Sequence, residues 1–245
     1  MSGVPQGFQR LDALAVKETV DRLQQRIAAR FPRRNLRLVA REISAAIDDL
    51  LLTEHVSLYK VFRYGSRVAM MLLAGVLVVG VAMVFRSEGL REPESIWAWI
   101  QIAESVINDV VFAGIAMYFL WQLPDRYRRR RDLAALHRLR SLAHVIDMHQ
   151  LTKDPERLRS DFERTDQSVD LGLTVIELAN YLEYCSELLS LVSKTAALFA
   201  EDTTDQTVLA TVEGIEDLTN GMSRKIWQKI ALLPAAGRPA VPPHS

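Results

Sequence analysis

The chain of 245 residues lacks most features that mark enzymes and secreted proteins. It has a single cysteine, Cys185, so no intrachain disulfide can form. It contains no Walker loop, no G-x-G-x-x-G, no G-x-S-x-G elbow, no HExxH and no paired CxxC. No stretch alternates apolar and polar residues as a half-buried strand does. These absences predict an all-α protein that is not an enzyme and holds no cofactor, and no characterised family is recognised.

Two long apolar runs dominate what is present. The first covers residues 68–85 (VAMMLLAGVLVVGVAMVF) without a charge, and the second covers residues 96–123. A run of about 18 or more apolar residues is long enough to cross a bilayer as a helix. Inside lipid the backbone must satisfy its own hydrogen bonds, so each span should be helical. The sequence therefore predicts a two-pass transmembrane hairpin with an outer loop at residues 86–95. A buried hairpin in a water-soluble core is the alternative, and the length of both runs disfavours it.

Arginines at the outer ends of the two runs predict the orientation of the hairpin. The loop 86–95 holds two arginines against three glutamates. Basic residues close to the ends of spans stay on the cytoplasmic side. Both termini are therefore expected in the cytoplasm of a bacterial-type inner membrane, with the arginines beside anionic lipid headgroups. Because the N-terminus has no apolar region before residue 60, the first span is expected to act as the insertion signal. The arginines that carry this prediction are Arg63, Arg67, Arg126, Arg128, Arg129, Arg130 and Arg131.

The formal net charge is zero but it is unevenly spread. Residues 1–67 and residues 124–160 each carry a net charge of +5, whereas residues 161–245 carry −7. The basic segments flank the spans, and this position explains the RYRRRR run at residues 126–131 without a nucleic-acid partner.

Helical periodicity divides the remainder of the chain. Residues 1–66 predict amphipathic cytoplasmic helices, with one at residues 8–31 that either lies on the membrane or packs in a bundle. A second helix is expected from Leu36 into the first span. Residues 67–123 form the hairpin, and residues 124–233 form a cytoplasmic helical domain. Pro124 can kink the chain after the second span, and a further helix in the direction of the span is expected from there to about Leu151. Residues 234–245 form a proline-rich tail that need not be ordered.

A heptad pattern marks the helix that follows the capping box Thr174-x-x-Glu177. Its apolar positions alternate in steps of four and three, which is typical of coiled-coil packing. We expect this seam, together with the acidic hairpin that residues 174–232 form, to carry an interaction with a second copy or another protein. The seam consists of Leu178, Leu182, Cys185, Leu189, Val192, Ala196 and Phe199.

Five polar residues recur at helical spacing in the second run: Gln101, Glu104, Ser105, Asn108 and Asp109. A charge at the bilayer centre costs about 2.5–3.5 kcal/mol on insertion scales, and intramembrane acids usually face an interior or water. Three interpretations remain open. The stripe binds helices together by hydrogen bonds, it lines an ion path in an oligomer, or the span begins later and Glu104 lies among the headgroups.

Three residues form a weak candidate metal site. His137 and His144 are seven residues apart on one predicted helix, and Asp147 follows three residues later. A histidine and a carboxylate at this spacing can bind a metal in a helical bundle. No Glu-x-x-His pair supports the site, so the sequence predicts no metal.

The leading functional hypothesis is a non-enzymatic membrane anchor or assembly subunit that self-associates or docks a partner through its cytoplasmic helices. The alternative is an oligomeric ion channel, or an ion-coupled subunit, that uses the acidic stripe of the second span.

Overall fold

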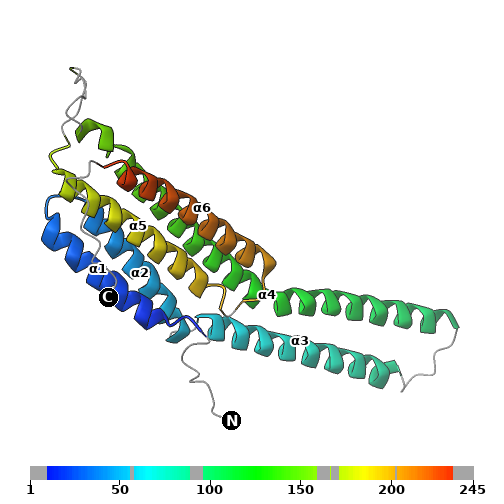
Figure 1. The fold of residues 1–245 in the computed structure, drawn as a ribbon. Helices are drawn as coiled ribbons and strands as arrows, with labels where there is room; N and C mark the ends of the chain where they lie inside the picture. Colours follow the sequence, from blue (N-terminus) through cyan, green and yellow to red (C-terminus); the bar gives the residue numbers. More distant parts are fainter. Residues whose placement is uncertain are drawn as a thin grey trace, which may run out of the picture. The chain divides into compact units, whose positions relative to one another are not determined.

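A computed structural model describes residues 10–55, 58–88, 96–158, 166, 171–201 and 203–233. Across these ranges the chain forms six α-helices and one short 3-10 helix, with no strand (Figure 1). The predicted all-α class is confirmed. Residues 1–9, most of the outer loop, most of residues 159–170 and the tail 234–245 lie outside the described residues, as do the side chains of Phe85 and Trp99.

The chain divides into two units, and each is described separately. Unit 1 combines residues 1–52 with residues 132–245, so it draws on both ends of the sequence. Unit 2 consists of residues 53–131. The two predicted spans belong to unit 2, while the amphipathic and heptad-patterned segments belong to unit 1.

The first helices of unit 1 are α1 (Ala13–Arg30) and α2 (Leu36–His55). Helix α1 begins where the Asp12 carboxylate accepts a hydrogen bond of 2.8 Å from the Leu14 amide, which satisfies one free donor of the first turn. It ends just before Phe31 and Pro32, because proline cannot continue the hydrogen-bonding pattern.

The structure describes α2 up to His55 and a further helix, α3 (Leu58–Glu88), from Leu58. The predicted continuation of one helix from Leu36 into the first span depends on residues 56–57, which lie outside the described residues. The two helices belong to different environments. The apolar face of α2 is buried in the core of unit 1, whereas α3 belongs to unit 2 and leaves most of its described apolar side chains exposed.

Helix α4 (Ile96–Leu151) contains the whole second apolar run and continues beyond it. Pro124 lies inside this helix, and the predicted continuation of the span to about Leu151 is confirmed. Its residues up to Arg131 belong to unit 2, and those from Asp132 onward belong to unit 1.

In the described residues after α4, one short 3-10 helix and two long helices complete unit 1. A 3-10 helix, η2 (Pro155–Leu158), follows Asp154, whose carboxylate accepts a hydrogen bond from the Glu156 amide at 3.1 Å. Helix α5 (Val175–Leu198) opens with the predicted capping box between Thr174 and Glu177. Helix α6 (Gln206–Ala231) follows its N-cap residue, Asp205, and packs against α5 (Figure 1).

The core of unit 1 draws apolar side chains from every helix of the unit. Val20 and Ile27 of α1, Ile43 of α2, Leu139 of α4 and Ile215 of α6 are all fully buried. The apolar face of α1 is therefore committed to the bundle rather than to a membrane surface, which answers the question that the sequence left open.

Candidate functional site

Two helices of unit 2 are long and apolar enough to cross a membrane. The first stretch is Val61–Met83 in α3, and the second begins at Ala103 in α4. Only 6% of the most apolar window of either helix is buried. A core helix of a water-soluble protein would hide its apolar side chains, whereas here Leu72, Val76 and Phe112 are 66%, 70% and 71% exposed. This apolar surface is the first candidate functional surface of the chain.

An aromatic pair joins the basic ends of these two helices. The rings of Phe62 in α3 and Tyr127 in α4 stack with centroids 4.9 Å apart. The arginines that precede the first span and those that follow the second therefore lie at the same end of unit 2. Arg126 is exposed, donates a hydrogen bond of 2.9 Å to Gln122 Oε1 and lies 5.7 Å from the Phe119 ring.

The remaining arginines of this basic end are arranged around both helices. Arg67, Arg129 and Arg130 are exposed, whereas Arg63, Arg128 and Arg131 are half-buried. A cluster of this charge, next to an apolar helix pair, can bind anionic headgroups.

The polar stripe of the second run lies on α4, and all five of its side chains are exposed. In the described part of unit 2 no basic side chain forms an ion pair with Glu104 or Asp109, and neither one has any other recorded polar contact. In water these groups would simply be hydrated. In a bilayer they would need a partner that the two helices of one copy do not supply.

The seam residues are placed together, but inside the protein. Leu178, Leu182, Cys185, Leu189, Val192 and Ala196 are 0% exposed and Phe199 is 6% exposed. Helix α5, which carries them, contacts α1, η2 and α6 of the same chain. The heptad pattern therefore marks the side of α5 that its own bundle covers, and a partner would have to contact other residues.

The thiol of Cys185, in this seam, has low reactivity. Burial raises the pKa of the Cys185 thiol to about 12, against an ordinary value of 9.0. Because the thiolate is the nucleophilic form, native Cys185 is a poor nucleophile.

The candidate metal residues do not converge on one another. His137 and His144 are exposed on α4, and the half-buried Asp147 accepts a hydrogen bond of 2.6 Å from Gln150 Nε2. In the described ranges no group of three histidine, cysteine or acidic side chains is close enough to hold a metal ion.

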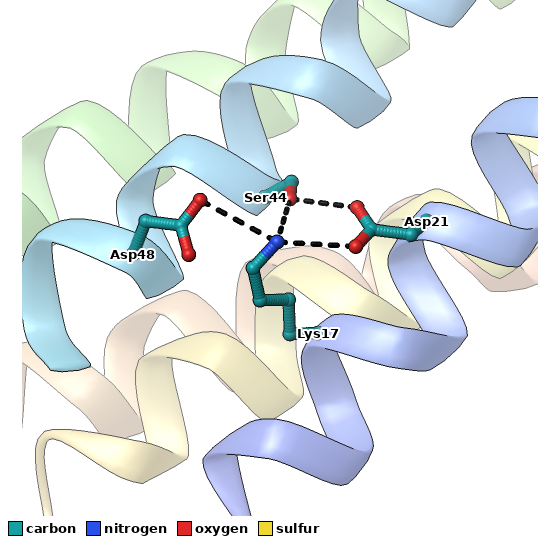
Figure 2. A network of polar contacts seen from close by, with 4 residues as sticks. All are labelled: Lys17, Asp21, Ser44 and Asp48. Atoms are coloured by element: carbon teal, nitrogen blue, oxygen red, sulfur yellow. Dashed lines mark hydrogen bonds and ion pairs between the residues drawn. The ribbon is translucent and has the colours of Figure 1, made fainter.

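A polar network between α1 and α2 was not visible in the sequence. Lys17 Nζ lies 3.1 Å from Asp21 Oδ2 and 3.4 Å from Asp48 Oδ2 (Figure 2). It also donates a hydrogen bond of 3.2 Å to Ser44 Oγ, and the Ser44 hydroxyl in turn donates to Asp21. The hydrogen bond to Asp21 is the main reason that the pKa of Lys17 is raised. All four side chains are paired with one another, so the network has a structural role in joining the two helices.

A second polar cluster lies where α4 and α6 end, and sequence reasoning missed this one too. Lys229 Nζ donates a hydrogen bond of 3.0 Å to the carbonyl oxygen of Gln150, in the last turn of α4. Such a cation neutralises the negative end of a helix. Burial lowers the pKa of Lys229. Burial together with the charge of Lys153 lowers the pKa of His149, and the Nδ1 atom of His149 lies 3.4 Å from the Tyr181 hydroxyl. Only tertiary packing could reveal this cluster, because its members are far apart in sequence.

Comparison with protein-family models, with curated proteins and with solved structures finds no match to this chain. The functional argument therefore rests on the surfaces described above.

Proposed function

We propose that this chain is a non-enzymatic anchor of a bacterial-type inner membrane. In this proposal α3 and the first part of α4 cross the bilayer, both termini lie in the cytoplasm, and unit 1 is a cytoplasmic helical bundle. The polar stripe of α4 contacts a second copy or another subunit within the membrane. The observation that carries the proposal is the stripe itself, with five exposed polar side chains within the apolar first part of α4, residues 96–123.

The energetic argument starts from the cost of the stripe. Each charged side chain at the centre of a bilayer costs about 2.5–3.5 kcal/mol on insertion scales, and less near the surface. Hydrogen bonds between helices in a membrane recover on the order of 0.6–2 kcal/mol each. Because two helices alone leave all five side chains exposed, association through the stripe lowers the cost of keeping them in lipid.

The basic end of unit 2 supports the proposed orientation. The stacked rings of Phe62 and Tyr127 hold the two arginine clusters at one end of the helix pair. Aromatic rings are frequent at the level of the lipid headgroups, so this end is expected at a membrane surface. Anionic headgroups attract each arginine near the surface by about 1 kcal/mol.

Orientation is tested by labelling introduced cysteines in intact cells with a membrane-impermeant maleimide. Ser95→Cys, in the predicted outer loop, should react in intact cells. Ser141→Cys, on an exposed position of α4, should react only after the membrane is broken. The unaltered chain is the control, because Cys185 is fully buried and its raised pKa suppresses the reaction. The reverse pattern, or equal labelling of both variants, contradicts the proposed topology.

Association through the stripe is tested by disulfide crosslinking of the full chain, in which Cys185 is the only native cysteine. Ser105→Cys replaces a hydroxyl of the stripe with a thiol of similar shape, and mild oxidation should give a dimer of this chain. Ile107→Cys is the matched control, because Ile107 is 61% exposed but lies about 160° from Ser105 around the helix. Native mass spectrometry of the solubilised complex separates the two forms of the proposal, a homo-oligomer or a complex with a second polypeptide. A lone monomer, with no crosslink from Ser105→Cys, contradicts both forms.

An oligomeric channel is the second candidate function. It is favoured by Glu104 and Asp109, which form no ion pair with a basic side chain among the residues that the structure describes. Rings of carboxylates select cations when several copies surround a pore. Glu104→Gln and Asp109→Asn should then alter cation flux in liposomes while the oligomer stays intact. Absence of flux through the unaltered protein rules the channel out and leaves the anchor.

A further inference from the structure

The part of α4 that belongs to unit 2 carries two rows of side chains with heptad spacing. One of them, the covered row, is packed within the chain: Ala113 and Pro124 are buried, and the other members are half-buried. Tyr127 is the last member and stacks on Phe62 of α3, so the covered row faces α3 (Figure 1). The covered row consists of Val106, Ala113, Met117, Leu120, Pro124 and Tyr127.

The other row, the exposed row, lies on the opposite side of α4. Ile115, for example, is about 160° around the helix from Ala113. All six members are exposed, and the apolar ones, Phe112, Ile115 and Phe119, are 71%, 50% and 54% exposed. Their positions alternate in steps of four and three, the spacing with which parallel helices pack side by side. The exposed row consists of Gln101, Ser105, Asn108, Phe112, Ile115 and Phe119.

The length of the exposed row matches a bilayer. From Gln101 to Phe119 it covers about 27 Å of helix, close to the hydrocarbon thickness of about 30 Å. It stops at the basic end of unit 2, where Gln122 Oε1 accepts a hydrogen bond of 2.9 Å from Arg126 and the guanidinium lies 5.7 Å from the Phe119 ring. A helix lying along the exposed row would therefore contact α4 across most of the membrane.

The polar members of the exposed row are complementary to copies of themselves. The amides of Gln101 and Asn108 each carry donors and an acceptor, and the Ser105 hydroxyl both donates and accepts. Copies of one chain insert with the same orientation, so two α4 helices related by a two-fold axis are parallel and place each residue against its equivalent. Lipid chains are as apolar as the other members, so these hydrogen bonds supply the specificity. A buried asparagine in such a row fixes the register of coiled coils.

The two acids of the polar stripe flank the exposed row and do not belong to it. Glu104 immediately precedes Ser105, and Asp109 immediately follows Asn108. In a parallel heptad pair the side chains that flank the contact approach one another across the interface. Glu104 of one copy would thus lie near Asp109 of the other. Because like charges repel, the acids oppose the association that the amides favour.

We infer that the exposed row of α4 binds the same row of a second copy, parallel and in register, and forms a two-fold dimer within the membrane. The inference rests on the proposed membrane function and names the partner of the polar stripe. The three polar members give the contact its register, the three apolar members pack toward the basic end, and the flanking acids limit the affinity.

The first test is disulfide crosslinking at the apolar end of the exposed row, outside the polar stripe. Phe119→Cys should give a dimer when membranes that contain the full chain are mildly oxidised, and Ile115→Cys should do the same. Trp121→Cys is the matched control. Trp121 is also an exposed aromatic residue, 66% exposed and two residues away, but it lies about 160° from Phe119 around the helix. The unaltered chain should give no crosslink, because Cys185 is fully buried.

The second test measures the affinity of the dimer by sedimentation equilibrium of the full chain in detergent. Asn108→Ala should weaken the dimer by roughly 3-fold to 30-fold, the range for one hydrogen bond between helices in a membrane. Glu104→Gln should strengthen the dimer, because a neutral amide replaces a carboxylate that is repelled. Ile107→Ala, at an exposed position outside the row, should leave the affinity unchanged.

Four outcomes overturn the inference. Equal crosslinking of Phe119→Cys and Trp121→Cys shows random collision. A weaker dimer in Glu104→Gln places this acid inside the contact and contradicts the register. A complex with another polypeptide in place of a second copy leaves the anchor proposal intact. Absence of any crosslink, with the expected maleimide labelling of Ser95→Cys and Ser141→Cys, removes the dimer alone, whereas reversed labelling contradicts the membrane orientation itself.

Discussion

Replacing Leu178 with alanine should destabilise unit 1 strongly, and this change tests whether the heptad seam is core or docking surface. Leu178 is 0% exposed at the start of α5. Truncation of a buried leucine to alanine costs about 2–5 kcal/mol, because apolar contacts are lost and a cavity remains. The matched control is Ile176→Ala in the same turn, where the side chain is 60% exposed and the expected change is below about 0.5 kcal/mol.

The single cysteine provides the assay. Cys185 is fully buried, and burial raises its pKa to about 12, so a thiol reagent reacts only when unit 1 opens. Leu178 precedes it by seven residues, about 10 Å along the helix, so the cavity does not directly expose the sulfur. When opening is fast relative to labelling, the reaction rate follows the free energy of opening. A loss of 2–5 kcal/mol then raises the rate by about 30-fold to several thousand-fold, at a factor of ten for each 1.4 kcal/mol.

This assay reports unit 1 without interference from the apolar helices of unit 2, which contain no cysteine. Equal labelling rates for Leu178→Ala and Ile176→Ala would refute the reasoning, since they would show that the seam does not support the core. Rapid labelling of the unaltered chain would refute the burial of Cys185 itself.

Two further predictions concern the pH dependence of unit 1 and are measured by urea unfolding followed by circular dichroism, because thiol labelling needs the thiolate and is too slow in acid. Burial acts to raise the pKa of Asp21, but hydrogen bonds from Ser44 and Lys17 outweigh it and hold the pKa below 3.8. The ionised carboxylate therefore stabilises the fold above pH 3.8, and this contribution is lost as the pH falls through the lowered pKa. Because Asp21 is 40% exposed, Asp21→Asn should cost at most about 1 kcal/mol at pH 7, and an equal cost at pH 3 would contradict this account. Burial and Lys153 hold the pKa of His149 below 6.5, so protonation opposes folding and the free energy of unfolding should fall as the pH drops below 6.5. His149→Gln should remove this loss of stability. An unchanged pH profile in His149→Gln would show that another group titrates.

Local sequence signals explain several helix ends, but the start of α1 was predicted wrongly. A helix was expected from residue 8, whereas residues 10–12 are not helical and Asp12 caps α1, which begins at Ala13. The capping box at Thr174 and Glu177, the cap at Asp154 and the stop before Pro32 all act within one turn, so a short stretch of sequence contains the whole interaction. Pro124 marked a position where the sequence allowed a kink, and α4 is a single helix that contains this proline and continues to Leu151.

Long-range contacts could not be predicted in the same way. Arg26 pairs with Glu187 across 161 residues, and Arg138 pairs with Glu42 across 96 residues. Charge patterns along each helix permit many such pairings, and only the packing of the bundle selects among them.

The sequence by itself determined the helical class, the two apolar helices and the polar stripe, because hydropathy and helical period are properties of neighbouring residues. The tertiary structure decided what each apolar face contacts. It committed the face of α1 and the seam of α5 to the core of unit 1, and it left the described stripe residues of α4 exposed. The physical reason is that periodicity shows that a face must be buried, but the burial can be supplied by the same chain, by a second chain or by lipid, and all three leave the same pattern in the sequence.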